Sequence, residues 1–341
     1  MNEPKSKALS GEESIIQQYL EPLAAGFPGA FGLKDDCAVF SPSPGHDVVL
    51  KTDPIAEGIH FLPDDDAADV GWKALAVNVS DLAAKGARPS AYLMALSFPE
   101  APTHAWMARF AEGLKAAQAA FGVHLVGGDT DRRPGPLSIS VTVLGEVPAG
   151  RMVRRGAAQP GDRIYVSGQL GEAAIGLRLR LDAGFGQDAG VSGEAARAAM
   201  SRYVRPQPRL ALRDVLLTHA RAAMDLSDGL AKDLGRMAAA SGCGAHVELT
   251  RLPVGAAGAA LLANGQGWEL VAANGDDYEI LAAVAPEHAA AFEEGAARAG
   301  GEADTPFQVT HIGEMRQDRT VVLAMPDGGQ FVPPRAGWDH F

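Results

Sequence analysis

The chain has 341 residues, of which 47% are hydrophobic and 21% charged, so it can bury a sizeable core. A single core rarely grows to this length, and we expect two domains of roughly 150 residues each. The 42 acidic residues outnumber the 30 basic ones and give a formal net charge of −12. Nucleic acid is therefore not expected as a partner, because phosphate backbones are bound by clustered lysines and arginines.

The cysteine content and the lack of long apolar runs indicate a cytoplasmic protein. The only cysteines are Cys37 and Cys243, too few for a disulfide framework, which fits a reducing compartment. The first residues contain no apolar signal-peptide core, and no apolar run reaches the roughly 18 residues that a membrane span needs. We therefore expect no membrane as a partner.

The first part of the chain predicts alternating helices and strands. Ser10 and Glu13 have the spacing of a capping box, and apolar residues follow at helical intervals as far as Leu23. Thr103 is a good cap for another helix. In chain order after the first helix, the patterns predict strands over 37–40 and 48–51, a helix over 69–85, a strand over 92–98, a helix over 103–121, and strands over 124–126 and 137–147.

A stretch rich in Gly and Pro follows Val147 and indicates a domain boundary near residue 150. We therefore expect an α/β domain over 1–150 and an α+β domain over 151–341. The second domain is predicted to contain strands over 163–167, 221–225, 245–249, 279–284, 310–315 and 320–325, and helices over 171–183, 208–219, 228–241 and 286–299.

Several well-known catalytic motifs are missing from the sequence. It contains no GxxxxGK[ST] phosphate loop, no GxGxxG after a strand, and no protein-kinase HRD and DFG pair. It also lacks the GxSxG and HExxH patterns. Hydrolysis through a nucleophilic serine or cysteine, or through zinc, therefore has no support.

Short acidic clusters recur where apolar runs meet loops or helices, at 34–36, 52–53, 80–81, 128–130, 225–228 and 274–279. Each alone fits a helix cap or a turn, and Ser227 or Asp228 would cap a helix over 228–241. Together they indicate more, because carboxylates brought close repel one another unless cations lie between them. Oxygen ligands without His or Cys favour Mg²⁺. The clusters therefore predict a phosphoryl-transfer site with several magnesium ions, where Gly127 and Gly128 let the backbone approach a nucleotide.

Eight stretches, in this order, also resemble a known family. They are GLKDDCAVF, KTDPIAEGIHF, KALAVNVSDLAAKGARP, LVGGDT, GRMVRRGAAQPGD, MDLSDGL, NGDDYEI and the terminal GWDHF. From about residue 10 to the last residue, the chain resembles the thiamine-monophosphate kinase family. That family belongs to the superfamily of aminoimidazole ribonucleotide synthetase and selenophosphate synthetase.

The resemblance implies a fold and a reaction. The N-terminal α/β domain would bind ATP and Mg²⁺ and form a homodimer through strands that meet in a barrel. The C-terminal α+β domain would complete the active site. The implied reaction is the Mg²⁺-dependent phosphorylation of thiamine monophosphate by ATP, giving thiamine diphosphate by direct in-line transfer.

The resemblance also implies roles for individual residues. Asp53, Asp129 and Asp225 would be catalytic. The implied magnesium ligands are Asp36, Thr52, Asp53, Asp81, Asp129, Asp225 and Asp228, and the implied ATP contacts are Gly128, Asp129, Arg155 and Ser227. His60, Asp276 and Trp338 would hold thiamine monophosphate. By residue type alone, His60 would be a structural histidine and Trp338 would equally fit a packed tail.

Three residues depart from the family pattern. Lys51 stands where a small residue is usual; a lysine cannot ligate a metal there, so either one magnesium position changes or an ammonium group replaces it. Lys34 replaces a common glycine, and Asp276 stands where glutamate is frequent. Lys51 leaves open a non-catalytic homologue that binds nucleotide and Mg²⁺. Another ATP-dependent kinase or synthetase of the superfamily and a metal-dependent phosphatase also remain open.

Asp225 is the acidic residue that helix capping explains least, because it precedes the expected cap by two positions. We expect it to be a metal ligand from the second domain, facing the aspartates of the first domain across ATP.

Overall fold

The structure is a computed structural model that describes residues 11–335, 337 and 338. The chain divides into two compact units. Unit 1 comprises Met1–Leu82 and Arg88–Gly150, and unit 2 comprises Ala83–Ala87 and Arg151–Phe341. Within the part of the chain that the structure describes, no helix is long and apolar enough to cross a bilayer.

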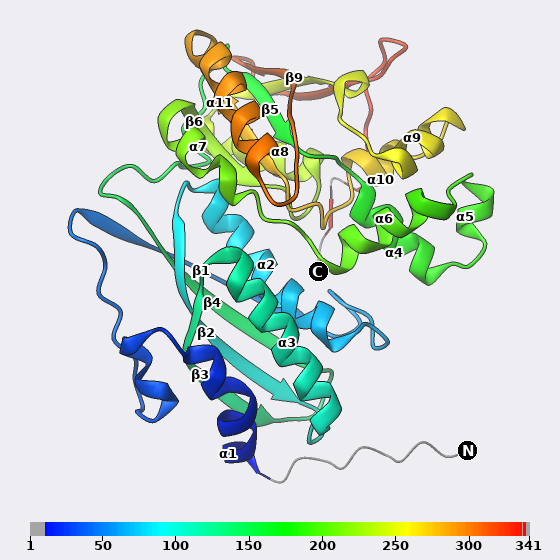
Figure 1. Cartoon of the computed structure of the whole chain (residues 1–341). Helices are drawn as coiled ribbons and strands as arrows, with labels where there is room; N and C mark the ends of the chain where they lie inside the picture. Colours follow the sequence, from blue (N-terminus) through cyan, green and yellow to red (C-terminus); the bar gives the residue numbers. More distant parts are fainter. Residues whose placement is uncertain (1–10, 336, 339–341) are drawn as a thin grey trace. The chain divides into compact units, whose positions relative to one another are not determined.

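Unit 1 is built on a mixed four-stranded sheet with the order β1-β4-β2-β3. Its strands are β1 (His46–Ala56), β2 (Arg88–Phe98), β3 (His124–Arg132) and β4 (Ser138–Pro148). β4 pairs antiparallel with β1 and β2, whereas β2 and β3 are parallel and are joined through helix α3 (His104–Phe121). Helices α2 (Ala67–Ala84) and α3 lie on the same face of this sheet (Figure 1).

Local sequence signals explain much of unit 1. β4 has the alternation that its sequence predicts, with Ile139, Val141 and Val143 buried towards the helices. The predicted cap of α3 is confirmed, because Thr103 Oγ1 accepts a hydrogen bond from Trp106 N at 3.1 Å. Gly122 ends α3 in the left-handed conformation, at φ 69°.

The N-terminal segment differs from the prediction of one continuous helix. It forms four short pieces: α1 (Glu12–Ile15), the π-helical η1 (Ile16–Leu20), and the 3₁₀ segments η2 (Glu21–Ala24) and η3 (Pro28–Leu33). Pro22 and Pro28 stand in the first turns of the 3₁₀ segments, where a proline is tolerated but cannot continue a helix. Ser10, the expected cap, lies outside the described residues.

The strand expected over 37–40 is wrong, because these described residues form no strand. Val39 N donates to Gly29 O at 2.8 Å, so the segment is tied to η3 instead of to the sheet. A short apolar run is equally compatible with a strand and with an extended loop, so the sequence pattern alone did not distinguish them.

Unit 2 contains a six-stranded sheet with the order β10-β7-β9-β5-β8-β6. Only the β10–β7 pair is parallel. The strands are β5 (Arg163–Ser167), β6 (Ala220–Asp225), β7 (Gly244–Glu248), β8 (Ile280–Val284), β9 (Val309–Arg316) and β10 (Val321–Ala324).

Each expected helix of unit 2 is present, with shifted bounds, and the chain also forms helices that its sequence did not indicate. The expected ones are α4 (Glu172–Leu181), η4 (Leu210–Leu212) running into α7 (Arg213–His219), α8 (Leu230–Ser241), and η6 (Pro286–His288) running into α11 (Ala289–Glu302). The unexpected ones are α5 (Phe185–Asp188), α6 (Gly193–Val204), η5 (Leu249–Arg251), α9 (Ala256–Ala263) and α10 (Trp268–Ala272).

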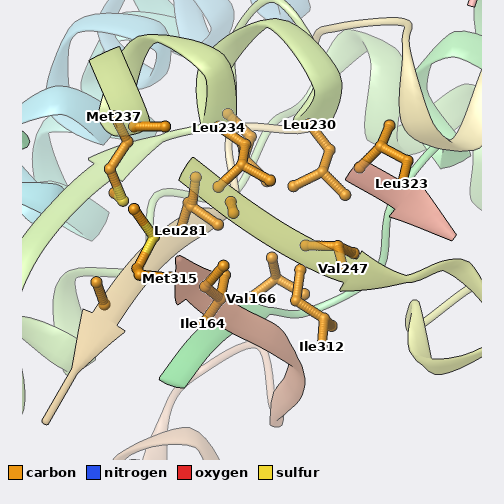
Figure 2. Close-up of a cluster of buried hydrophobic side chains, with 14 of the residues drawn as sticks. Ile164, Val166, Leu230, Leu234, Met237, Val247, Leu281, Ile312, Met315 and Leu323 are labelled. Atoms are coloured by element: carbon orange, nitrogen blue, oxygen red, sulfur yellow. The ribbon is translucent and has the colours of Figure 1, made fainter. Parts of the chain in front are cut away.

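The main core of unit 2 lies between α8 and the sheet. Figure 2 shows Leu230, Leu234 and Met237 of α8 packed against strand residues such as Val166 and Leu281. Leu230, Leu234 and Met237 follow a spacing of three or four residues, which places them on one helix face. This packing fixes the start of α8, where several of the predicted site residues lie.

Candidate active site

The Asp53 and Asp81 carboxylates of unit 1 converge on one lysine. Lys51 and Asp53 alternate along β1 and therefore point to the same face, where α2 carries Asp81. Lys51 Nζ lies 2.9 Å from Asp53 Oδ2 and 2.7 Å from Asp81 Oδ2. Burial lowers the pKa of Lys51, but the charges and hydrogen bonds of Asp81 and Asp53 outweigh it and raise that pKa above its ordinary value. The lysine is thus charged at neutral pH.

Asn78 holds the backbone of Asp53, and the sequence did not indicate this role. Because β1 is an edge strand, one row of its backbone groups has no neighbouring strand to pair with. Asn78 Oδ1 accepts from Asp53 N at 2.8 Å, and Asn78 Nδ2 donates to Asp53 O at 3.3 Å. The available signal was a polar Asn within an otherwise apolar stretch of α2.

Thr52 and Asp129 lie on the other face of the sheet. Successive residues of a strand face opposite sides, so Thr52 points away from Asp53 and Asp81. The Thr52 hydroxyl donates to Val141 O at 3.1 Å and accepts from the Thr142 hydroxyl at 2.9 Å. The structure therefore does not bring this side chain to the Lys51 cluster.

The sheet register separates Asp53 from the Gly128 loop. Cross-strand pairing connects Asp53 to Gly128 through two intervening residues. Asp53 of β1 pairs with Val141 of β4, which pairs with Met94 of β2, which in turn pairs with Gly128 of β3. Three strand spacings place Asp53 and Gly128 about 14 Å apart. Asp129 is the next residue along β3, so its side chain points to the face opposite that of Asp53. Asp53 and Asp129 are therefore not ligands of one common ion within a single chain.

Asp36, Gly128 and Asp129 line a common cavity within unit 1, with a volume of about 520 Å³. Asp35, Cys37 and Thr130 also line it, and apolar side chains such as Leu20 and Leu125 form much of the remainder. Asp129 Oδ1 accepts from Thr130 N at 2.8 Å. The cavity offers oxygen donors beside an apolar wall, which suits a ligand with a charged end and a flat apolar end.

His60 lies in the turn after β1 and contacts the last residue of that strand. Ala56 N donates to His60 Nδ1 at 3.1 Å, so this ring nitrogen is an acceptor and carries no proton. The contact closes the turn after β1. It accounts for the histidine structurally and leaves its role towards a substrate as a prediction.

Asp225 and Ser227 of unit 2 lie beside the acidic 274–279 segment. Leu226 N donates to Glu279 O, and Asp276 N donates to Ser227 O at 2.9 Å, so the segments pair beyond the end of β6. A Cβ on Gly275 would lie 2.0 Å from Ser227 O, so only glycine fits there. Asp276 itself has φ 70°, an uncommon value for a residue with a side chain. The structure thereby brings Ser227 and Asp276 together.

Asp228 is paired with cations and with the C-terminal segment. Its Oδ2 lies 2.5 Å from Arg236 Nη1 and 3.3 Å from Lys232 Nζ. Asp228 O accepts from Trp338 N at 3.1 Å, and Lys232 Nζ donates to Trp338 O. The predicted metal ligand Asp228 and the predicted substrate residue Trp338 are therefore neighbours.

The expectation that Ser227 or Asp228 caps the following helix is wrong. The helix begins at Leu230, and its N-cap residue is Gly229, at φ 109°. The Asp233 side chain accepts from Asp228 N at 2.9 Å and so takes a capping role from within the first turn. Desolvation raises the pKa of the Asp233 carboxyl to about 6. Asp225, Ser227 and Asp228 are thus not required as side-chain caps.

A buried ion-pair network supports the 274–279 segment, and the sequence did not reveal it. Glu279 Oε2 accepts from Arg209 Nε and from the Ser167 hydroxyl, both at 2.6 Å, and Arg202 lies 3.3 Å from Oε1. Desolvation raises the pKa of Glu279, but the charges and hydrogen bonds of Arg209 outweigh it and leave that pKa below its ordinary value. Glu279 therefore stays ionised although it is fully buried.

The pKa of the Asp277 carboxyl is shifted upwards, in the opposite direction to that of Glu279. Gly171 N donates to both of its carboxylate oxygens, at 2.9 and 3.0 Å. Desolvation nevertheless raises the pKa of Asp277 well above its ordinary value. Arg155 is exposed, and its backbone carbonyl accepts a hydrogen bond from the Ser241 hydroxyl at 3.3 Å. The role of its side chain towards ATP stays a prediction.

The predicted ligands are compatible with Mg²⁺ held partly by a substrate. Among residues 11–335, 337 and 338, no three His, Cys, Asp or Glu side chains lie close enough together to hold a metal ion. Mg²⁺ usually takes only one or two carboxylates and completes its shell with water and substrate phosphates. The oxygen donors Asp36 and Asp129, at one cavity, match that donor set.

Both halves of the chain match models of one fold family. The model for the N-terminal domain of AIR synthase related proteins matches residues 34–147, and the model for the C-terminal domain matches residues 159–324. A solved hydrogenase maturation protein HypE shares the fold, with a TM-score of 0.72 at 20% identity, and covers 97% of this chain and 99% of its own. The fold is therefore that of the AIR synthase related proteins.

Relatives with higher sequence identity show which family within this fold the chain belongs to. The thiamine-monophosphate kinase of Caulobacter vibrioides is 40% identical over 95% of this chain and 89% of its own length. That of Salmonella typhimurium is 38% identical over 97% and 98%. The crystal structure of the thiamine-monophosphate kinase from Stenotrophomonas maltophilia K279a matches with a TM-score of 0.80 and 35% identity, over 96% of this chain and all of its own. The chain belongs to the thiamine-monophosphate kinase family.

One further solved relative has ligands bound. AaThiL complexed with AMPPCP and TMP is 30% identical to this chain, with a TM-score of 0.74 and 97% coverage of both chains.

Proposed function

We propose that the protein transfers the terminal phosphoryl group of ATP to thiamine monophosphate and so makes thiamine diphosphate. The observation that carries this proposal is the 40% identity to a thiamine-monophosphate kinase over 95% of the chain. A relative that binds AMPPCP and TMP supports ATP as the co-substrate and thiamine monophosphate as the acceptor.

The acidic residues of both units suit a reaction between two polyanions. The acceptor is a phosphate oxygen, which is ionised at neutral pH, so the reaction needs no general base. Catalysis then depends on aligning the phosphates and neutralising their charge. When bound, Mg²⁺ would supply that neutralisation. The proposed magnesium ligands are Asp36, Thr52, Asp53, Asp81, Asp129, Asp225 and Asp228.

Other residues would hold the two substrates. We assign ATP contacts to Gly128, Asp129, Arg155 and Ser227, with Arg155 as a fixed cation for phosphate oxygens. His60, Asp276 and Trp338 are assigned to thiamine monophosphate, and the Trp338 ring suits the cationic thiazolium. The contacts between Trp338 and the start of α8 support a shared role for Trp338, Ser227 and Asp228.

The two domains would have different roles in the proposed reaction. Residues 1–150 would bind ATP and Mg²⁺ and form the dimer, and residues 151–341 would complete the active site. Cys37 and Cys243 are free thiols, which fits the proposed cytoplasmic location.

Exposed apolar side chains support a homodimer through unit 1. Leu50 on β1 is 64% exposed and Leu93 on β2 is 41% exposed, both on the sheet face opposite α2 and α3. The N-terminal segment packs on this face at Ala91 and Val126. Apolar side chains clustered on a sheet face are typical of an interface. A second copy of the chain, forming the barrel, is the proposed partner.

One assay tests the function. The purified protein is incubated with ATP, Mg²⁺ and thiamine monophosphate, and thiamine diphosphate is followed by chromatography. Stoichiometric ADP and thiamine diphosphate are the expected products. ADP without thiamine diphosphate would favour a hydrolase, and bound ATP without either product would favour a non-catalytic homologue. The Lys51 ammonium held by Asp53 and Asp81 is the observation that keeps this last alternative open.

A further inference from the structure

The Lys51 ammonium lies between the carboxylates of Asp53 and Asp81, two residues that β1 and α2 place near each other. Asn78 on α2 fixes the backbone of Asp53 through two hydrogen bonds, and the same helix carries Asp81. Asn78 Nδ2 also donates to Ala74 O at 3.1 Å, which orients the amide. β1 and α2 therefore place the backbones of Asp53 and Asp81 near each other, and their carboxylates meet at Lys51.

Carboxylates so placed repel each other unless a cation lies between them. Lys51 Nζ contacts one oxygen of each carboxylate, at 2.9 and 2.7 Å. Lys51, Asp53 and Asp81 are each partly screened from water, which strengthens the attraction relative to a fully exposed ion pair. The lysine thus does electrostatically what a bound metal ion would do at the same point.

We infer that Lys51 is a built-in cation that replaces one divalent ion at the Oδ2 atoms of Asp53 and Asp81, so that the protein binds one metal ion fewer than this arrangement of carboxylates would otherwise hold. The Oδ1 atoms are left for the magnesium ions that Asp53 and Asp81 are proposed to ligate. The inference deepens the proposed function and rests on it, because it concerns the charge compensation of the same magnesium-dependent site.

The dimensions of the cluster suit such a replacement. Mg²⁺ binds oxygen at about 2.0–2.1 Å, so each carboxylate would need to move by only about 0.6–0.9 Å to become a metal ligand. Removing the lysine side chain would also open space for the water molecules that Mg²⁺ retains. A small residue at position 51 should therefore convert the ammonium position into a metal site.

The experiment counts bound Mn²⁺ in variants of the full chain. The paramagnetic resonance signal of free Mn²⁺ is titrated with protein at one fixed, saturating concentration of AMPPCP. The variant is Lys51→Ser, with Lys51→Ala as the second variant if the first does not give the wild-type circular dichroism spectrum. The matched control is Lys115→Ser, which removes an exposed lysine of α3 and changes the net charge equally.

The expected result is one additional Mn²⁺ per chain in the Lys51→Ser variant and the wild-type number in Lys115→Ser. Lys51→Arg, which keeps a cation, should retain the wild-type number. Adding Asp53→Asn to Lys51→Ser should abolish the additional ion. An unchanged count in both small-residue variants would overturn the inference and leave Lys51 as a structural ion-pair partner, and so would an equal rise in Lys115→Ser.

The count is independent of turnover, so it separates this inference from the proposed function. If Lys51→Ser binds an additional ion but the wild-type protein makes no thiamine diphosphate, the inference about Lys51 holds and the proposed kinase reaction is rejected. If the wild-type protein makes thiamine diphosphate but Lys51→Ser binds no additional ion, the kinase reaction holds and the inference about Lys51 is rejected.

Discussion

Asp53 is held by its backbone and its side chain at once. Asn78 binds both backbone polar groups of this residue, and Lys51 binds its carboxylate. A side chain fixed in this way pays little entropy when it contacts a ligand, which is the condition for accurate alignment of phosphates. Asp225 at the end of β6 is 5% exposed, and its backbone pairs with Ile280 of β8.

Replacing either aspartate by asparagine should remove most of the activity without unfolding the protein. We expect Asp53→Asn and Asp225→Asn each to lower kcat/KM for thiamine monophosphate at least ~100-fold, because a neutral amide neither attracts Mg²⁺ nor aligns charge. The measurement is steady-state formation of thiamine diphosphate. Asp304→Asn, at an exposed position of unit 2, is the control and should keep wild-type activity. Wild-type activity in either test variant would remove that residue from the site.

Glu279 should make the stability of unit 2 depend on acid. Its folded-state pKa is depressed, so its stabilising contribution is present above the ordinary pKa of glutamate and is lost as the pH falls through the folded value. We expect the free energy of unfolding to rise less steeply with pH below about 4.5 in Glu279→Gln than in the wild type. Urea unfolding between pH 3 and pH 7 measures the slope, and equal slopes would contradict the assignment.

At the scale of elements, the pair of Arg209 and Glu279 connects η4 to β8. Arg209 directly precedes η4, and Glu279 directly precedes β8. Arg209 and Glu279 are both fully buried, and Glu279 precedes Ile280, the first residue of β8. The pair holds the end of the 274–279 segment, whose residues Asp276 and Tyr278 have φ values of 70° and 49°. A segment with such φ values persists only where its surroundings determine it.

Removing the cation should therefore destabilise the fold markedly. Arg209→Met leaves the Glu279 carboxylate buried without its main partner, and we expect a loss of about 3–5 kcal/mol in the free energy of unfolding. Arg213→Met, which removes a partly exposed arginine paired with exposed Asp214, should cost less than about 1 kcal/mol. Chemical denaturation at pH 7 compares them. Equal effects of the two substitutions would show that burial of the Arg209 pair has no energetic consequence.

The elements that the sequence predicted well are those with a strong local signal. β4 alternates cleanly and α3 has a Thr cap and a Gly stop, so their residues alone specify them. The helices α5, α6, α9 and α10 were not predicted. α5 and α10 span only four and five residues, which is too short for a periodic pattern, and the sequences of α6 and α9 are rich in Ala, which does not mark a buried face. Their helical state depends on packing within unit 2; for example, Ala199 of α6 and Leu261 of α9 belong to one buried cluster.

The candidate site was predictable as a set of residues but not as an arrangement. The acidic clusters stood out by composition, yet the expected strand ended at residue 51, and only the longer β1 places Thr52 and Asp53 on opposite faces of the sheet. The Lys51 contact depends on where α2 crosses the edge of the sheet, which no local pattern encodes. Asn78 and Arg209 were missed for the same reason, because each contacts a residue that is distant in sequence.

At the scale of the whole molecule, the exposed face of the unit 1 sheet predicts self-association. We expect the double variant Leu50→Asp, Leu93→Asp to weaken dimerisation at least ~100-fold, because two carboxylates would be buried at the interface. Sedimentation velocity over a concentration series measures the effect. The control is Leu181→Asp, which changes a leucine of α4 that is 61% exposed. A wild type that remains monomeric at all concentrations would contradict the proposed interface.

The cavity of unit 1 also has a practical consequence for spectroscopy. Cys37 lines this cavity beside Asp36, whereas Cys243 is buried and desolvation raises its thiol pKa, which slows its reaction with electrophiles. A maleimide dye added to the native protein should therefore attach at a single position without any cysteine having been engineered. Its fluorescence would then report ligand entry into the cavity in real time.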